Sequence, residues 1–185
     1  MLKSFMNKSL VHKTIYISLA IQIITTLISL DGFRYKLNPI DNTLKDILKI
    51  ETVVQLIEGF VYLWISYSVS NLNVMIDRRY MDWTITTPLM LISTVLYMKY
   101  NTETDEYKRN VNLKDFFKDN VSEVLLIVIL NGLMLAFGYL GEKKILDKNS
   151  SIIIGFAFFF GTFKYIYDKY VKDNDTNKNL FYFVF

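Results

Sequence analysis

The chain has 185 residues, of which 52% are hydrophobic and 21% charged, and its formal net charge is +3. This composition excludes a disordered chain, which lacks apolar residues, and the charge is too small to suggest a nucleic-acid-binding protein. With no cysteine and a single histidine, the sequence has no disulfide scaffold and lacks the usual ligands of zinc and copper. Seven glycines and two prolines are too few for an all-β protein of many tight turns.

The apolar residues are gathered in five long blocks, and a sixth begins near the end of the sequence. The blocks are residues 14–30, 53–69, 83–98, 124–141 and 152–167, and the sixth starts at residue 180. A membrane-spanning helix needs about 20 mostly apolar residues, which each block reaches with its flanking polar residues. In the alternative, a soluble bundle, the helices would alternate apolar and polar faces, but the first, fourth and fifth blocks are apolar all round. The sequence therefore predicts an all-α, polytopic membrane helix bundle.

The distribution of basic residues predicts the orientation of this bundle. The segments after the first, third and fifth blocks hold 13 Lys and Arg, whereas the segments on the other side hold 8. The positive-inside rule places the 13 in the cytoplasm and the N-terminus outside. No small-residue cleavage site follows the first block, so we expect that block to be retained as a span. The longest loop is expected at residues 99–120, and its second half can already be helical.

The third block begins beside an ionisable residue, Asp82. A charge inside a membrane is costly, so it is usually paired and usually functional. Arg79, one turn earlier, can pair with Asp82 or lie just beneath it, and the hydroxyl of Thr86, one turn later, can hydrogen-bond the carboxylate. Ser93 follows on the same face, roughly 16 Å from Asp82 at 1.5 Å per residue. The alternative is a structural Arg–Asp pair at a helix end, with Pro88 making an ordinary kink.

The second block contains a further carboxylate, Glu58, in the middle of the predicted span. Gln55 and Glu51 lie one and two turns earlier on a related face. A hydrated stripe of these three side chains would suit a cation channel, because carboxylates that line a pore select cations. The alternative is that Glu58 hydrogen-bonds a neighbouring helix.

Two segments of the sequence resemble one protein family. Residues 79–89, RYMDWTITTPL, resemble the third-helix motif of the microbial rhodopsins, R-Y-x-D-W-x-x-T-T-P-L. Residues 131–134, NGLM, with Gly138 and Gly141 beyond them, resemble the fourth helix of that family, whose small residues and Met line the retinal ring. The residues at positions 82, 86 and 93 form a D-T-S pattern that resembles the viral rhodopsins of giant viruses.

This resemblance implies a retinal-binding, light-driven ion transporter that is not an enzyme, most simply an outward proton pump. Asp82 would be the Schiff-base counterion and proton acceptor. The implied proton pathway consists of Arg79, Thr86, Ser93 and Glu58. The residues implied to line all-trans retinal are Tyr80, Trp83, Thr87, Met90, Asn131, Met134 and Gly138, and from the fifth block Phe158, Phe159 or Thr162. The implied partners are a lipid bilayer, protons or monovalent cations, and further copies of the chain in a homo-oligomer.

The family has seven helices in a single domain, so the resemblance implies that residues 1–185 form one rhodopsin-like domain that lacks the C-terminal helices. The retinal-linking lysine belongs to the seventh helix of the family, and Lys164, near the cytoplasmic end of the fifth block, is no substitute. Many pumps of the family have a carboxylic acid where this sequence has Ser93. Because serine cannot donate a proton at physiological pH, reprotonation through water is expected. A light-gated cation channel, a photosensory rhodopsin and a membrane protein without a chromophore are the alternatives.

Overall fold

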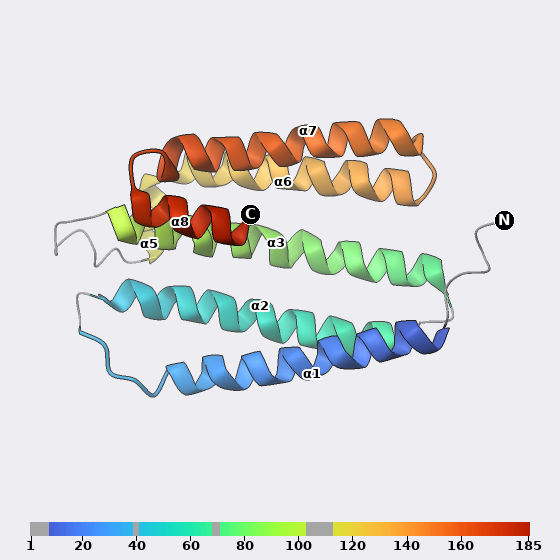
Figure 1. Ribbon diagram of the computed structural model, residues 1–185, viewed down its shortest axis with the longest axis horizontal. Coiled ribbons are helices and arrows are strands. Elements are labelled where there is room, and N and C mark those ends of the chain that lie inside the picture. The colour runs from blue at the N-terminus through green and yellow to red at the C-terminus, as the bar shows by residue number, and fades with distance from the viewer. Residues whose placement is uncertain (1–7, 39–40, 68–70, 103–112) are drawn as a thin grey trace.

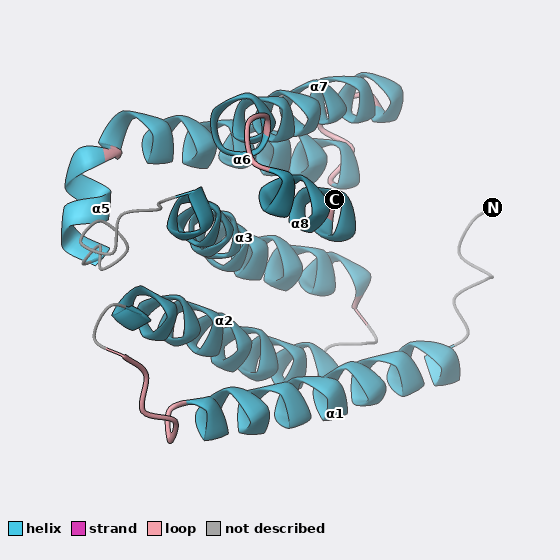
Figure 2. Cartoon of the chain, turned by 60° about the vertical axis from the view of Figure 1, so that its left-hand side comes forward, coloured by secondary structure: helices cyan, strands magenta, loops and turns pink. Residues whose placement is uncertain are grey.

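The computed structural model describes residues 8–38, 41–67, 71–102 and 113–185. Within these ranges the regular structure is all helical, and five long helices lie side by side along the longest axis (Figures 1 and 2). The elements are α1 (Lys8–Gly32), α2 (Asn42–Ser66), α3 (Leu72–Thr102), α5 (Leu113–Asp119), α6 (Val121–Glu142), α7 (Lys148–Ile166), the π-helical η2 (Tyr167–Val171) and α8 (Asp175–Val184). This arrangement confirms the predicted all-α bundle.

The helices extend beyond the apolar blocks that predicted them. Helices α2 and α3 begin at Asn42 and Leu72, well before residues 53 and 83. The blocks mark the part of each helix that suits hydrocarbon, whereas the backbone hydrogen bonds continue into the polar turns on either side. With 31 residues, α3 is about 46 Å long, so its ends extend past a hydrocarbon core of roughly 30 Å.

The expected loop at residues 99–120 is shorter than predicted. Helix α3 continues to Thr102, and α5 occupies Leu113–Asp119. The rest of the expected loop, residues 103–112, lies outside the described residues. Asn120 then separates α5 from α6 with a non-helical backbone conformation. The second half of the segment is therefore helical, as the sequence allowed.

Apolar side chains face outward on the long helices as well as inward. Ile28 on α1 is 66% exposed and Ile153 on α7 is 69% exposed, which suits lipid and not water. Among the described residues, three helices are long and apolar enough to cross a membrane: Lys13–Gly32, Val121–Glu142 and Lys148–Val171. The other two predicted spans, α2 and α3, carry the charged and polar residues of the candidate site.

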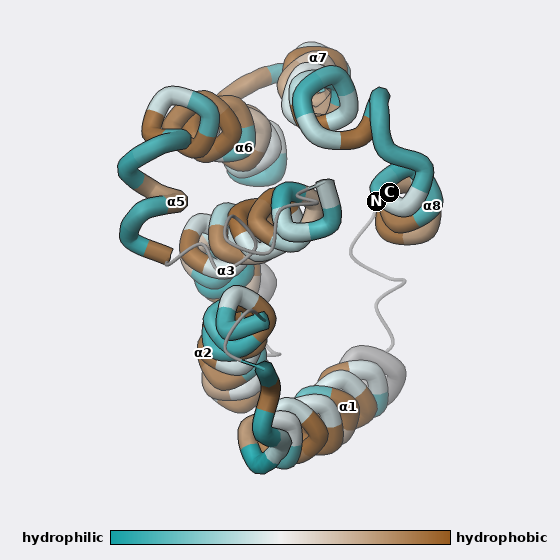
Figure 3. Tube along the Cα trace, turned by 90° about the vertical axis from the view of Figure 1, so that its left-hand side faces the viewer, coloured by the Kyte–Doolittle hydropathy of each residue, from teal (hydrophilic) through white to brown (hydrophobic). Residues whose placement is uncertain are grey.

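Helices that follow one another in the chain are also neighbours in space. The main contacts join α1 to α2, α2 to α3, α3 to α6 and α6 to α7. Seen end-on, these helices form an arc, and α8 lies beside it near α3 and η2 (Figure 3). We call the end of the bundle with the turn between α6 and α7 the turn end, and the opposite end, where α8 begins, the α8 end (Figure 1).

The side chain of Asn177 fixes the corner at which α8 begins. It is fully buried, and its Nδ2 donates to the carbonyls of Met98 and Tyr170, both at 2.8 Å. Its Oδ1 accepts from Asn101 Nδ2 at 3.2 Å. The amide therefore ties the start of α8 to the end of α3 and to η2. The predicted sixth helix starts at this corner, at Asp175, a little earlier than its apolar residues indicated.

Candidate functional site

Asp82 lies on the inner face of α3, in the middle of the bundle. Its side chain is 3% exposed, and its Oδ1 has no hydrogen-bond partner among the described residues. Thr86 and Ser93, at 0% and 1% exposed, share this buried face. The structure therefore brings together the polar line that the spacing predicted. A buried carboxylate oxygen without a partner is costly, which marks Asp82 as the centre of the candidate site.

Arg79 lies one turn from Asp82 but forms no ion pair with it. Its guanidinium lies over the Trp83 ring, 4.7 Å from the ring centroid, in a cation–π contact. Of the two geometries that the spacing allowed, the ion pair with Asp82 is absent among the described residues. The guanidinium contacts the Trp83 ring instead.

The hydroxyl of Thr86 does not bond the carboxylate, contrary to the expectation from the sequence. It donates to the backbone carbonyl of Asp82 at 3.0 Å. Thr87 and Thr84 follow the same rule and donate to the carbonyls of Trp83 and Tyr80, at 2.6 and 2.7 Å. Threonine in a helix favours the carbonyl one turn earlier because that acceptor is always within reach.

Ser93, at the far end of the polar line, contacts a second carboxylate. Its hydroxyl donates to Glu51 Oε1 on α2 in a short hydrogen bond and also contacts the carbonyl of Met90 at 2.9 Å. The sequence placed Glu51 in the polar stripe of α2 but did not join it to Ser93. That contact depends on how α2 is rotated against α3, and no pattern within a single helix reports this rotation.

The rest of the polar stripe on α2 faces α1. Gln22 Nε2 donates to Glu58 Oε2 at 2.8 Å, and Ser29 Oγ donates to Gln55 Oε1 at 3.0 Å. These pairs agree with the simpler of the two interpretations of Glu58, a hydrogen bond to a neighbouring helix. The stripe is therefore a set of interhelical bonds that connects α1, α2 and α3.

Tyr62 is a site residue that sequence reasoning missed. Its phenol lies within electrostatic reach of Glu58, Asp82 and Arg79. The signal was present in the sequence, because Tyr62 follows Glu58 by four residues and so continues the same helix face by one turn.

Two adjoining cavities lie between α3, α6 and α7. The large cavity has a volume of about 860 Å³, the small cavity about 200 Å³, and both are lined by Met134 and Phe159. Tyr80, Trp83 and Gly138 also line the large cavity. Thr87, Met90, Asn131 and Thr162 also line the small cavity. All seven residues that the resemblance assigned to retinal therefore line one cavity or the other, whereas Phe158 stacks on Phe137 instead.

Two contacts hold α6 against α3 beside these cavities. Asn131, 3% exposed, donates from Nδ2 to the hydroxyl of Thr87 at 2.8 Å. Gly138 faces Tyr80 so closely that a Cβ at this position would lie 2.8 Å from the phenol oxygen. A glycine at position 138 therefore gives the Tyr80 side chain its place against α6.

The chain matches the family described as "Bacteriorhodopsin-like protein" over residues 13–181. The chain belongs to the bacteriorhodopsin-like family. Among solved structures, this rhodopsin is similar to one described as "Crystal structure of viral rhodopsin OLPVRII", with a TM-score of 0.76 and 26% sequence identity. The match covers 93% of this chain and 76% of that chain. Comparison with curated protein sequences gives no match. The resemblance to microbial rhodopsins, and to their viral members, is thus confirmed.

Membership of this family defines the general character of the rhodopsin. It is a multi-pass integral membrane protein that lies in a lipid bilayer. Its family implies a retinal chromophore and a role as a light-driven transporter or sensor. The described residues fit such a chromophore, because aromatic, methionine and small residues line the two cavities and a buried oxygen of Asp82 has no hydrogen-bond partner among the described residues. Lys164 is not placed for a covalent link to it, since its Nζ lies on the surface, 2.7 Å from Asp168 Oδ2.

Proposed function

We propose that this rhodopsin is a light-driven outward proton pump in which Asp82 is the Schiff-base counterion and proton acceptor. The observation that carries the proposal is the unpartnered, buried Oδ1 of Asp82 on the helix face that holds the D-T-S residues. When bound, all-trans retinal supplies a light-absorbing polyene with a protonated nitrogen. The residues implied to hold it are those that line the two cavities.

Asp82 has two favourable states in an apolar interior. It is stable as an anion when a cation lies opposite, and it is stable as a neutral acid when it holds a proton at Oδ1. Thr86 leaves both carboxylate oxygens available, because its hydroxyl is already used by the Asp82 carbonyl. Arg79, which has no ion-pair partner among the described residues, supplies a nearby positive charge that attracts the anion without blocking proton uptake.

Glu51 supplies the acid that Ser93 lacks. The two side chains share a hydrogen bond, so a carboxyl group lies next to the position where many pumps place their internal proton donor. A carboxylic acid can give up a proton near neutral pH and a serine hydroxyl cannot. We therefore assign reprotonation to Glu51, with Ser93 holding it, in place of direct reprotonation through water.

The direction of transport follows from the loop charges. Of the 13 basic residues of one side, the 11 described ones belong to the α8 end, and of the 8 on the other side the 7 described ones belong to the turn end, so we place the turn end outside with the N-terminus. Three residues of this count, Lys3, Lys108 and Arg109, lie outside the described residues. Under this orientation Glu51 lies on the cytoplasmic side of Asp82. We also propose that residues 1–185 form a single rhodopsin domain and that the protein assembles as a homo-oligomer.

A light-gated cation channel is the second candidate. The observation that favours it is the series of interhelical polar contacts through Glu51, Gln55 and Glu58 on α2. If light loosened these contacts, their carboxylates would line a path for cations between α1, α2 and α3. The pump requires only that protons move between Glu51 and Asp82.

Photocurrent measured under voltage clamp separates the candidates. The full-length protein is expressed with all-trans retinal, and the current is recorded over a range of voltages. A pump gives an outward current at all accessible voltages. Asp82→Asn abolishes this current, whereas in Glu58→Gln the current remains outward. A current that reverses near a cation equilibrium potential and changes selectivity in Glu58→Gln supports the channel instead. A coloured protein without current would contradict both and leave a photosensor.

A further inference from the structure

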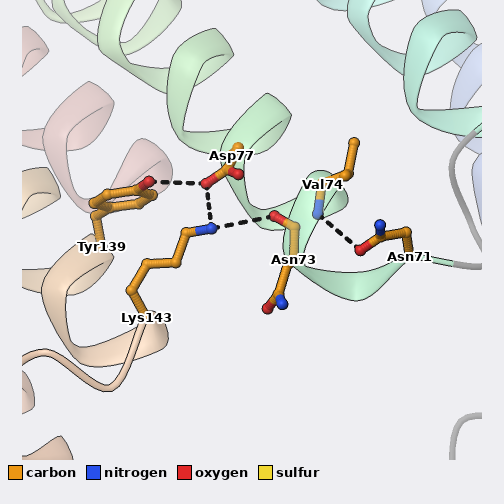
Figure 4. A network of polar contacts seen from close by, with 6 residues as sticks. All are labelled: Asn71, Asn73, Val74, Asp77, Tyr139 and Lys143. Atoms are coloured by element: carbon orange, nitrogen blue, oxygen red, sulfur yellow. Dashed lines mark hydrogen bonds and ion pairs between the residues drawn. The ribbon is translucent and has the colours of Figure 1, made fainter.

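An ion pair at the turn end joins α3 to α6 outside the site described above. Lys143 Nζ lies 2.6 Å from Asp77 Oδ1, and the same oxygen accepts from the hydroxyl of Tyr139 at 2.8 Å (Figure 4). Lys143 also approaches the carbonyl of Asn73 at 3.5 Å. One carboxylate oxygen thus holds two side chains at the C-terminal end of α6, Tyr139 within the helix and Lys143 just after it, which lie 62 and 66 residues further along the chain.

The tyrosine of this network begins a series of aromatic contacts that leads to the candidate site. The ring of Tyr139 meets the ring of Tyr80 edge-on, with centroids 5.2 Å apart, and Tyr80 meets Trp83 in the same way at 5.3 Å. Trp83 in turn carries the guanidinium of Arg79. Edge-to-face aromatic pairs have preferred geometries, so a shift of the first ring is passed to the next.

The Tyr80 side chain is closely packed and has little room to move if the ring of Tyr139 shifts. Its phenol oxygen lies against Gly138, where even a methyl group would be only 2.8 Å away. Tyr80 is therefore held between α6 on one side and Trp83 on the other. The ring of Tyr139, whose hydroxyl donates to Asp77, is a further neighbour of the Tyr80 ring.

We propose that the Asp77–Lys143 ion pair positions the aromatic side chains that line the large cavity, Tyr80 and Trp83. It acts on them through Tyr139. We call Tyr80 and Trp83 the aromatic wall. The proposal rests on the proposed retinal function, but its first readout does not need retinal. An isolated surface ion pair contributes little to stability. This pair differs because Asp77 Oδ1, which pairs with Lys143, also accepts a hydrogen bond from Tyr139. The ring of Tyr139 contacts Tyr80 of the aromatic wall.

The test follows Trp83 directly. Trp64 and Trp83 are the two tryptophans of residues 1–185. The difference between a Trp64→Phe background and the same background with Trp83→Phe isolates the signal of Trp83. In this background, Lys143→Gln and Tyr139→Phe are compared with Lys143→Arg, which keeps the charge, and with Lys164→Gln, which breaks an exposed ion pair on α7. The near-ultraviolet circular dichroism and the fluorescence maximum of Trp83 are recorded in lipid vesicles without retinal. The absorption maximum is then recorded with retinal.

We expect Lys143→Gln and Tyr139→Phe to weaken the dichroism of Trp83 and shift its emission, and to move the absorption maximum of the loaded protein. Lys143→Arg and Lys164→Gln should keep the parent values. A lower unfolding temperature with unchanged Trp83 signals would overturn the proposal and leave a mere tie between two helices. If the parent protein takes up no retinal, the proposed function fails, and the Trp83 signals still decide the role of the ion pair.

Discussion

Ser93 on α3 donates a hydrogen bond to a carboxylate oxygen of Glu51 on α2, across 42 positions of the chain. The serine stands where the family resemblance placed a proton donor, and the acid comes from the neighbouring helix. Under the proposed mechanism, the pair of helices would supply the acid that the third helix alone lacks. This division also explains why a motif written for one helix misses the acid.

The first prediction concerns this pair. In Glu51→Gln the recovery of the light-induced absorbance change should slow by about 10²-fold, because a positioned acid contributes roughly that much to a proton transfer. Ser93→Ala should slow it less, since the acid remains. Flash photolysis of the retinal-loaded protein measures both. Glu123→Gln, which removes a carboxylate near the same end of the bundle, should recover at the parent rate, and equal rates in all variants would remove Glu51 from the mechanism.

The second prediction concerns the counterion. Asp82→Asn should move the absorption maximum to longer wavelength and stop light-driven acidification of the medium, because the neutral amide no longer stabilises a nearby cation. Absorption spectra and pH recordings with and without a protonophore check this. Asp168→Asn is the control, since that exposed carboxylate pairs with Lys164 on the surface of the bundle. An unchanged spectrum in Asp82→Asn would refute the assignment.

The third prediction compares two glycines of α6. Gly138→Ala should destabilise the protein and alter the absorption maximum, because the new methyl group forces Tyr80 to move. Gly132→Ala adds the same methyl group where nothing lies within 4 Å, and it should stabilise the helix by up to about 1 kcal/mol. Thermal unfolding and absorption spectra of the two variants measure the difference. Equal effects would mean that the contact with Tyr80 has no consequence.

The fourth prediction concerns the hydrogen bond between Asn131 and Thr87. A double-mutant cycle with Asn131→Ala and Thr87→Val should give a coupling of about 0.6 kcal/mol and at most about 1.7, the range of hydrogen bonds between membrane helices. Unfolding in mixed detergent micelles supplies the four free energies. Thr87 keeps its bond to the carbonyl of Trp83 in Asn131→Ala, so that single change should be the milder one.

The fifth prediction concerns pH at the start of α7, outside the membrane spans. Asp147 Oδ2 accepts from the backbone amides of Ser150 and Asn149, both at 3.1 Å, and these bonds lower the pKa of the carboxyl below its ordinary value of 3.8. The contribution to stability is therefore fully present above pH 3.8 and is lost as the pH falls through the lowered pKa. Hydrogen exchange of the two amides should accelerate in that window. Asp147→Asn, which caps without titrating, should show no such step.

The sequence predicted the features that are determined within a single helix. It missed the contacts that depend on how two helices pack against each other. The burial of Asp82, Thr86 and Ser93 on one face followed from helical spacing. The bond from Ser93 to Glu51 depends on the rotation of α2 against α3, which has no signature within either helix. The hydroxyl of Thr86 was assigned to the wrong acceptor because a carbonyl of its own helix is always nearer than a side chain whose conformation is not known.

The cavities show the same division. The family motif supplied the seven lining residues, and the structure places all of them at the two cavities. For the fifth block no motif set the register, and of its three candidates Phe159 and Thr162 line a cavity while Phe158 does not. Extending the predicted polar stripe on α2 by one turn would have included Tyr62.

The buried amide of Asn177 has a consequence for biosynthesis. Its side-chain partners Met98, Asn101 and Tyr170 all precede it in the chain, so a ribosome delivers them to the membrane first. A buried amide without these partners would face the desolvation cost of an unsatisfied polar group. The buried position of Asn177 is therefore favourable only when α3 and η2 are in place, so we expect the start of α8 to pack after them during synthesis. In an immature chain, the side-chain amide of Asn177 would still lack its hydrogen-bond partners, and protein quality control would encounter it in that state.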